Sequence, residues 1–261
     1  MMTILDQLAE HARQRVAVAR TIRPMEDIRR KALLLPKGDF PFERALSGDD
    51  LAFICECKRA SPSKGMIAPD FPYMDIARSY EDAGAEAVSV LTEPKWFMGS
   101  DEYLRQIAES VSIPCLRKDF MVDAYMLYEA KLLGASAALL ICAILDAAQL
   151  KDYIQICDGL GLSALVETHD EAEAEMALRA GARIIGVNNR NLKDFTVDTG
   201  NSRRLRAMIP RDALFVSESG VRDASDVQAA REMGANAVLV GEALMRAVDK
   251  RAKLAELRGG L

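Results

Sequence analysis

The sequence predicts an α/β protein, a (β/α)8 TIM barrel with an N-terminal helical extension. Two observations lead to this prediction. From Leu51 onward, near-continuous apolar runs alternate with amphipathic segments, which is typical of buried parallel strands joined by helices. A short phrase, Gly-Ala followed by an apolar run, also recurs four times along the chain.

Eight apolar runs are the strand candidates, and the segments between them mostly have helical periodicity. Representative helical segments are Tyr73–Ala83, Ala124–Leu133, Asp170–Ala180 and Ser225–Met233. The predicted strands cover residues 51–57, 86–91, 113–117, 137–142, 163–167, 184–188, 214–218 and 236–240.

The repeated phrase fixes the unit of the barrel. It begins at Gly84, Gly134, Gly181 and Gly234, where each glycine is expected to end a helix just before a strand. These positions precede the second, fourth, sixth and eighth strands, so the repeat is a pair of βα modules. An open doubly wound sheet is disfavoured because no G-x-G-x-x-G motif follows the first strand.

Residues 1–48 are expected to form a helical extension. Thr3-x-x-Asp6 resembles a capping box, and Pro24 begins a second helical run. No linker rich in glycine, serine or proline follows. We therefore expect residues 1–48 to pack on a barrel of residues 49–261, in a single domain overall.

The composition is that of a globular enzyme, with 50% hydrophobic and 28% charged residues. The net charge of −5 disfavours nucleic acid as the main partner. No run of about 18 apolar residues could cross a membrane, and the first residues lack the features of a signal peptide, so we expect a cytoplasmic protein.

The cysteines and histidines of the sequence indicate neither a redox motif nor a metal site. The five cysteines are expected to be reduced, buried hydrophobes, because Cys55-x-Cys57 has the wrong spacing for a metal or redox motif. His11 and His169 lie far apart in the sequence, and no cluster has the spacing of metal ligands. Acid–base chemistry therefore falls to lysine and carboxylate, and no metal is expected.

Charged side chains follow several of the predicted strands, where this fold places its catalytic groups. Glu56 and Lys58 leave the first strand on one face, because side chains alternate along a strand. Lys118, Glu167 and Asn188 follow the third, fifth and sixth strands. Each alone could be a structural ion pair, but their convergence on one opening favours an active site.

The last two strands predict a phosphate site. Gly220 and Gly241 permit close approach of the backbone, and a helix over 242–245 begins directly after the eighth strand. Loops after strands seven and eight, with a short helix, form the usual phosphate site of this fold. The alternative is that both glycines simply make βα turns.

Apolar residues at the same rim could wall an aromatic substrate, although scattered core or rim aromatics would look the same in the sequence. The candidates are Trp96, Phe97, Phe120 and Leu139.

With these motifs the chain resembles the indole-3-glycerol phosphate synthase family. The resemblance covers nearly the whole chain, including the extension, and suggests the monofunctional form. The phrases that carry it begin at Glu56, Leu91, Arg117, Leu165, Gly186, Ser217 and Val238, and include Glu56-Cys57-Lys58-Arg59-Ala60-Ser61-Pro62-Ser63, Arg117-Lys118-Asp119-Phe120 and Gly186-Val187-Asn188-Asn189-Arg190-Asn191-Leu192.

The resemblance implies a carboxy-lyase of tryptophan biosynthesis that closes 1-(2-carboxyphenylamino)-1-deoxyribulose 5-phosphate to indole-3-glycerol phosphate. Lys118 would donate to the substrate ketone, and Glu167 would act in the dehydration. Lys58 would be a second acid or the anchor of the substrate carboxylate, with Glu56 and Asn188 orienting these groups. No cofactor is expected, because loss of carbon dioxide restores aromaticity.

The same resemblance assigns the remaining site residues. The family varies at Glu242 and His169, and a carboxylate at 242 could serve phosphate only through its backbone N–H, with its side chain turned away. Alternatives are a phosphoribosyl isomerase-type barrel or a non-catalytic barrel that binds phosphorylated ligands. We expect a monomer, with weak oligomerisation left open. The residues assigned to the phosphate end are Ser219, Gly220, Gly241 and Glu242, and Ser219 is also counted among the catalytic residues. The residues assigned to the anthranilate ring are Ser61, Phe97, Phe120 and Leu139. Arg190 would lie beside the substrate chain, and Leu239 is assigned to the substrate site.

Overall fold

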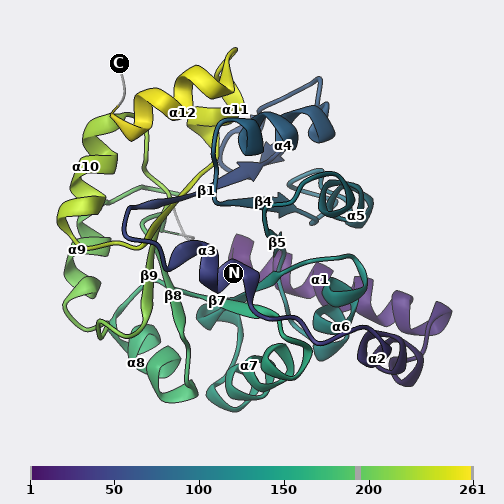
Figure 1. Ribbon diagram of the computed structural model, residues 1–261. Helices are drawn as coiled ribbons and strands as arrows, with labels where there is room; N and C mark the ends of the chain where they lie inside the picture. Colours follow the sequence, from purple (N-terminus) through teal and green to yellow (C-terminus); the bar gives the residue numbers. More distant parts are fainter. Residues whose placement is uncertain (1, 192–194, 260–261) are drawn as a thin grey trace.

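The computed structural model describes residues 2–191 and 195–259, and within them eight parallel strands close into a barrel (Figure 1). The strand order is β1-β10-β9-β8-β7-β6-β5-β4, so the barrel prediction is confirmed and the open sheet is excluded. Each predicted strand matches an observed one, with ends shifted by two residues at most. The barrel strands are β1 (Ala52–Cys57), β4 (Ala87–Leu91), β5 (Cys115–Lys118), β6 (Ala137–Ile141), β7 (Ser163–Thr168), β8 (Ile184–Asn188), β9 (Leu214–Glu218) and β10 (Ala237–Val240).

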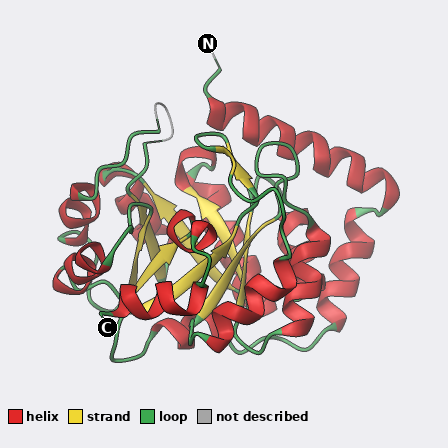
Figure 2. Cartoon of the chain, turned by 90° about the horizontal axis from the view of Figure 1, so that it is seen from above, coloured by secondary structure: helices red, strands yellow, loops and turns green. Residues whose placement is uncertain are grey.

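Helices surround the barrel (Figures 1 and 2). Shorter elements follow the carboxyl ends of strands, among them a small antiparallel hairpin of β2 with β3 after β1. The outer helices are α4 (Tyr73–Asp82), α5 (Asp101–Ser110), α6 (Ala124–Leu132), α7 (Ala147–Leu160), α8 (Glu171–Ala180), α9 (Gly200–Arg206), α10 (Ala224–Glu232) and α12 (Lys250–Arg258), and the shorter elements are β2 (Ala60–Ser61), β3 (Gly65–Met66), η1 (Cys142–Ile144) and α11 (Glu242–Arg246).

The glycines of the repeated phrase end helices, as predicted. All four have positive φ angles, between 74° for Gly234 and 89° for Gly181, and each lies one or two residues beyond the last helical residue. A left-handed φ is favourable only for glycine, and it turns the chain from the helix into the next strand. The sequence therefore repeats because the turn geometry repeats.

The N-terminal extension forms three helices, α1 (Ile4–Ile22), α2 (Met25–Leu34) and α3 (Pro41–Leu46). The predicted capping box of Thr3 and Asp6 is present, and α2 begins directly after Pro24. α1 lies along one end of the barrel in Figure 2, and α2 packs on α6. α3 lies at the amino-terminal ends of the strands, where the backbone N–H of Glu43 donates to Ser163 at the start of β7.

An ion pair and a histidine–carboxylate hydrogen bond fix α1 to loops that follow barrel strands. Arg15 binds Asp119 in a bidentate pair, with Nη1–Oδ2 and Nη2–Oδ1 distances of 3.0 and 2.6 Å. One turn earlier, His11 Nδ1 lies 3.1 Å from Oε1 of Glu93. Asp119 follows Lys118 at the end of β5, so the extension supports the backbone next to a predicted catalytic residue.

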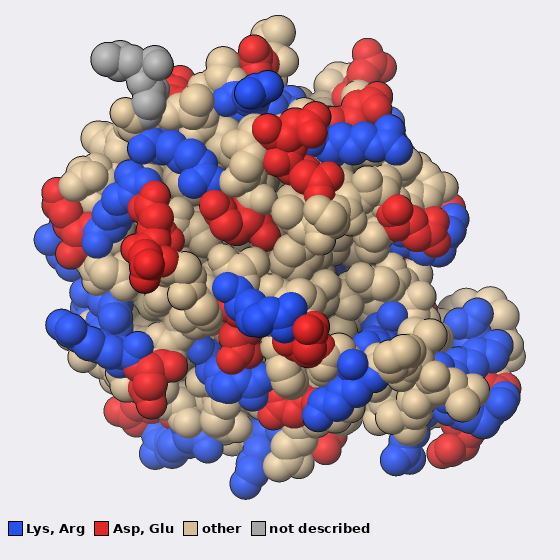
Figure 3. Space-filling view, viewed as in Figure 1, with Lys and Arg blue, Asp and Glu red and all other residues tan. Residues whose placement is uncertain are grey.

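The distribution of surface charges and the burial of the cysteines are as expected from the composition. Acidic and basic side chains are interspersed over the face shown in Figure 3. Among the described residues, no helix has both the length and the apolar character needed to cross a bilayer. All five cysteines are free and buried, which confirms their prediction as small hydrophobes.

Substitution of Arg15 tests the importance of the α1–Asp119 contact for stability. Burial raises the pKa of Asp119, but Arg15, together with Arg117 and Thr92, outweighs burial and holds that pKa below its ordinary value. Arg15→Ala leaves a buried carboxylate with fewer partners, so we expect a loss of about 2 kcal/mol in the free energy of unfolding at pH 7. Urea denaturation measures this loss.

The effect should depend on pH with a definite sign. A depressed carboxylate pKa adds stability above the unfolded-state value and loses it in acid, so the difference from wild type should shrink as the pH falls below about 4. The control is Arg13→Ala, which removes only an exposed pair with Glu10. Equal stability of the Arg13 and Arg15 variants at pH 7 would contradict the assigned role.

Candidate active site

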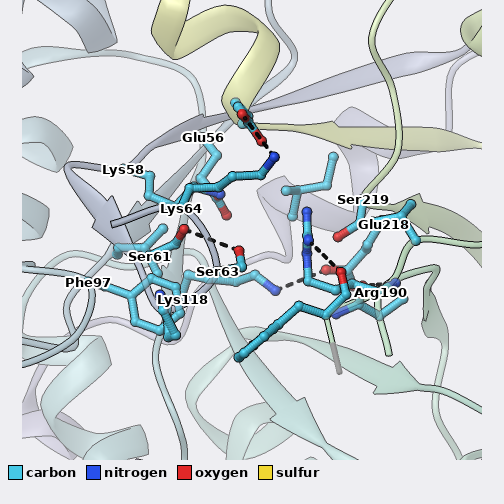
Figure 4. Close-up of a pocket in the computed structure, with 18 of the residues that line it drawn as sticks. Glu56, Lys58, Ser61, Ser63, Lys64, Phe97, Lys118, Arg190, Glu218 and Ser219 are labelled. Atoms are coloured by element: carbon cyan, nitrogen blue, oxygen red, sulfur yellow. Dashed lines mark hydrogen bonds and ion pairs between the residues drawn. The ribbon is translucent and has the colours of Figure 1, made fainter. Parts of the chain in front are cut away.

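A cavity of about 890 Å³ opens at the carboxyl ends of the barrel strands (Figure 4). Side chains of α1 form part of its wall, so the extension contributes directly to the site. All the residues that the resemblance assigned to the site line this one cavity: Glu56, Lys58, Ser61, Phe97, Lys118, Phe120, Leu139, Glu167, Asn188, Arg190, Ser219, Gly220, Leu239, Gly241 and Glu242.

Lys118 lies between two buried carboxylates. Its Nζ is 3.0 Å from Oε2 of Glu167 and 2.9 Å from Oε2 of Glu218. Burial lowers the pKa of this ammonium, but the two carboxylates outweigh burial and raise it above the ordinary value. Lys118 is therefore fully protonated at neutral pH and can donate a proton or a hydrogen bond.

Glu167 is the more acidic of these carboxylates. Burial raises its pKa, but Lys118 and the neighbouring His169 lower this pKa by more than burial raises it, so the net shift is downward. The second oxygen, Oε1, lies 3.3 Å from Nε2 of His169. Glu167 is thus an ionised group with a cationic neighbour at each oxygen.

Glu218 is a site residue that the sequence reasoning missed. Burial raises its pKa to about 7, and the negative charge of Glu167 adds to this against the opposing effect of Lys118. Its Oε1 is buried and has no hydrogen-bond partner among the described residues. The available signal was alternation, because Glu218 shares the face of Val216 at the end of an apolar strand.

Glu56 and Lys58 form a direct pair, with 2.5 Å between Oε1 and Nζ. The prediction that they leave β1 on one face is confirmed, since both line the cavity. A Cβ atom on Gly241 would lie 2.6 Å from Oε1 of Glu56 and 2.9 Å from Nζ of Lys58. The glycine therefore makes room for this ion pair, a role that the sequence reasoning did not include.

The apolar wall is only partly as predicted. Phe97 and Phe120 lie 6.1 Å apart between ring centroids and line the cavity together with Leu139. The prediction for Trp96 was wrong: it is not among the described lining residues, and its ring packs edge-on against His11 at 5.4 Å. Glu93 accepts hydrogen bonds from the N–H groups of 96 and 97, and this turn sends adjacent side chains in different directions.

The predicted phosphate end is formed by two successive residues with positive φ, Ser219 at 66° and Gly220 at 100°, and by α11. The Glu242 carboxylate lies 3.0 Å from Arg246 of its own helix and 3.6 Å from Lys64 of the β2–β3 hairpin. Lys64 is a second cavity residue that the sequence reasoning did not assign to the site.

The chain is similar to known proteins over nearly its whole length. A family model described as "Indole-3-glycerol phosphate synthase" matches residues 5–257. The chain belongs to the indole-3-glycerol phosphate synthase family. Relatives with that name share 56% identity over 257 residues in Ruminiclostridium cellulolyticum and 49% over 256 residues in Endomicrobium trichonymphae. Each alignment covers 98% of this chain and 99% of the relative.

Solved structures with low identity share only the fold with this synthase family member. 3-Hexulose-6-phosphate synthase from Salmonella typhimurium superposes with a TM-score of 0.61 at 15% identity, covering 80% of this chain and 97% of that one. Thiamine phosphate pyrophosphorylase from Pyrococcus furiosus gives 0.60 at 17% identity, covering 84% and 96%. The family motif that begins at Gly186 ends at Leu192, which lies outside the described residues.

Gly186 offers a test of the Glu218 position. A Cβ atom there would lie 2.1 Å from Oε1 of Glu218, so Gly186→Ala must displace this carboxylate from Lys118. We expect kcat to fall by roughly tenfold to a hundredfold in steady-state assays, because a small misplacement near the reacting groups is costly. Stability should fall by only about 1–2 kcal/mol.

The control is Gly159→Ala, in α7, where an added Cβ would meet nothing within 4 Å. This variant should keep the wild-type kcat and equal or greater stability, because alanine favours a helix over glycine. An unchanged kcat in Gly186→Ala would show that the Glu218 position does not matter for turnover.

The titration of Glu218 can be observed directly. Because its pKa is raised to about 7, the carboxyl group is protonated below neutral pH and ionised above it. Infrared difference spectra between about pH 5.5 and 8.5 should show a carboxylic-acid carbonyl band that disappears as the pH rises. The band should be absent in Glu218→Gln and present in the exposed control Glu232→Gln; its persistence in Glu218→Gln would refute the assignment.

Proposed function

We propose that this chain catalyses the ring closure, decarboxylation and dehydration of 1-(2-carboxyphenylamino)-1-deoxyribulose 5-phosphate to indole-3-glycerol phosphate. The observation that supports this most strongly is Lys118, a largely buried ammonium held by two carboxylates in a cavity with an aromatic wall. The family membership of the chain supports the same reaction.

The cavity has a separate region for each part of this substrate. The phosphate would bind at Ser219, Gly220, Gly241 and the backbone N–H of Glu242, where positive φ angles and a helix start present N–H groups. The anthranilate ring would lie against the apolar wall, with Lys58 near its carboxylate. The remaining contacts to the substrate would come from Ser61, Phe97, Phe120, Leu139, Arg190 and Leu239, all of which line the cavity.

Lys118 would drive ring closure. The ring carbon that bears the carboxylate attacks the ketone carbon, and the carbonyl electron pair moves to oxygen, which takes a proton from the ammonium. The bond to the carboxylate then breaks, its electron pair returns to the ring, and carbon dioxide leaves. Glu218 would exchange protons with Lys118, because it titrates near neutral pH and contacts Nζ.

Glu167 would act in the dehydration. As an ionised carboxylate it takes a proton from the methylene carbon beside the new ring bond, while Lys58 delivers a proton to the hydroxyl group, which leaves as water. Glu56 orients Lys58 through their 2.5 Å contact. Asn188 accepts a hydrogen bond from the backbone N–H of Arg190 and so fixes the loop after β8.

The decisive assay follows the rise of indole absorbance with the carboxyphenylamino deoxyribulose phosphate as substrate, in buffer containing a chelator. We expect turnover in the wild type and a loss of at least about 100-fold in kcat in Lys118→Ala and Glu167→Gln, since both remove groups used in bond making and breaking. The exposed control Lys151→Ala should behave as wild type.

Other outcomes would contradict specific parts of the proposal. Near-normal rates in both variants would refute the residue roles. Saturable binding without turnover in the wild type would favour a non-catalytic barrel that binds phosphorylated ligands. Absence of both binding and turnover would mean that this compound is not the substrate.

A further inference from the structure

His169 lies directly after β7 and is not among the described residues that line the cavity. Its ring is held between two carboxylates. Nδ1 lies 3.0 Å from Oε2 of Glu173, and Nε2 lies 3.3 Å from Oε1 of Glu167. The imidazole side chain is only 17% exposed, and it contacts Glu167 without being among the described residues that line the cavity.

The backbone around His169 is fixed independently of its ring. The N–H of His169 donates to Oε2 of Glu173 at 2.8 Å, so one carboxylate oxygen binds both the main chain and the ring. Glu173 lies in the first turn of α8, where its own N–H donates to the capping residue Asp170. Asn201 of α9 donates to the carbonyl oxygen of His169. The ring therefore has little freedom to leave Glu167.

The charge of the ring follows from these neighbours. Burial lowers the pKa of His169, but hydrogen bonding and the charges of Glu167 and Glu173 outweigh burial and raise it to about 10. The Nε2 nitrogen has no aligned hydrogen-bond partner among the described residues, so its contact with Glu167 is mainly one of charge. The groups that act on the ring or its two partners are Glu167 of β7, Asp170 and Glu173 at α8, Lys118 of β5, Glu218 of β9, and the buried Cys142 of η1, whose thiol pKa is raised by burial.

In the ligand-free site Glu167 has one cation at each oxygen, Lys118 at Oε2 and His169 at Oε1. In the proposed ring closure Lys118 gives a proton to the ketone oxygen and becomes neutral, so Oε2 of Glu167 no longer has a cation as its partner. Without His169, the Glu167 carboxylate would then have no cation beside it, and its proton affinity and rotational freedom would rise. A cation outside the cavity does not have to leave when substrate binds.

We propose that His169, held as an imidazolium by Glu173, is a positioning residue that keeps Glu167 oriented and ionised while Lys118 engages the substrate. This inference rests on the proposed function, because it concerns the base of the dehydration. In this proposal His169 and Glu173, which are not among the described lining residues, control the proton affinity of Glu167 inside the cavity.

The first test is the pH dependence of turnover in His169→Asn, which keeps an N–H donor but no charge. We expect kcat to fall by roughly tenfold to a hundredfold and KM to change by less than about threefold. The acid limb of the kcat profile should move upward by about one pH unit or more, because Glu167 loses the neighbour that lowers its proton affinity. Glu173→Gln should introduce a new loss of activity near neutral pH, where the unsupported imidazolium deprotonates.

A matched control lies on the same turn of α8. Glu171 is exposed and pairs with Arg204 on the surface, so Glu171→Gln removes one charge without touching His169. It should keep the wild-type kcat and pH profile. A lower kcat in His169→Asn with an unshifted acid limb would indicate a merely structural role and would overturn the proposal.

The second test does not depend on turnover. The chain has two histidines, so nitrogen-15 spectra of labelled imidazoles contain two ring systems, and His11→Gln assigns them. Both nitrogens of His169 should remain protonated through about pH 8 in the wild type. In Glu173→Gln the ring should titrate closer to neutral pH. A neutral His169 ring at pH 7 in the wild type would overturn the proposal.

The two tests separate this inference from the proposed function. Normal wild-type turnover with an unshifted His169→Asn profile would overturn the inference and leave the function intact. Absent wild-type turnover would overturn the function together with the role of His169 in catalysis, whereas the spectra would still decide the charge of the ring.

Discussion

The structure depends on keeping a lysine ammonium charged inside a mostly buried site. Removing an ion from water costs several kcal/mol unless well-placed opposite charges compensate. Lys118, whose side chain is 13% exposed, is compensated by Glu167 and Glu218. Two carboxylates at one ammonium cannot both be fully stabilised, and the burial of Glu218 leaves it with a pKa near 7 while Glu167 stays ionised. The same arrangement that keeps Lys118 protonated therefore gives its two neighbours different protonation states.

Space for these charges comes from two glycines, each in or just after the strand next to the one that carries the charged side chains. Gly186 of β8 faces the Glu218 carboxylate, and Gly241 after β10 faces the pair of Glu56 and Lys58. An alanine at either position would contact carboxylate oxygen atoms at well under 3 Å. The interior of the barrel mouth is thus filled by charged side chains where a purely structural barrel would place branched apolar ones. The same charged residues therefore fill the space at the mouth and compensate one another's charges.

The extension is part of this arrangement. α1 contributes apolar side chains to the cavity wall and pairs with Asp119, the residue after Lys118. His169 and Glu173 support Glu167 from another side, through α8. Support therefore reaches the reacting groups from elements outside the barrel as well as from the strands. This explains how a site on eight strand ends can hold its groups in one geometry.

The sequence by itself determined the barrel, its extension and the side chains that face the opening, because strand alternation and glycine turns are local properties. It predicted Glu56, Lys58, Lys118 and Glu167 for the same reason. Only the tertiary structure decided the partners, since Lys118 and Glu218 are a hundred residues apart and meet only when the barrel closes. It also turned Trp96 away from the cavity and brought His169 to Glu167, because a loop conformation and the start of α8 set those directions. Local patterns in the sequence predicted the candidate catalytic groups, and long-range packing set their charges.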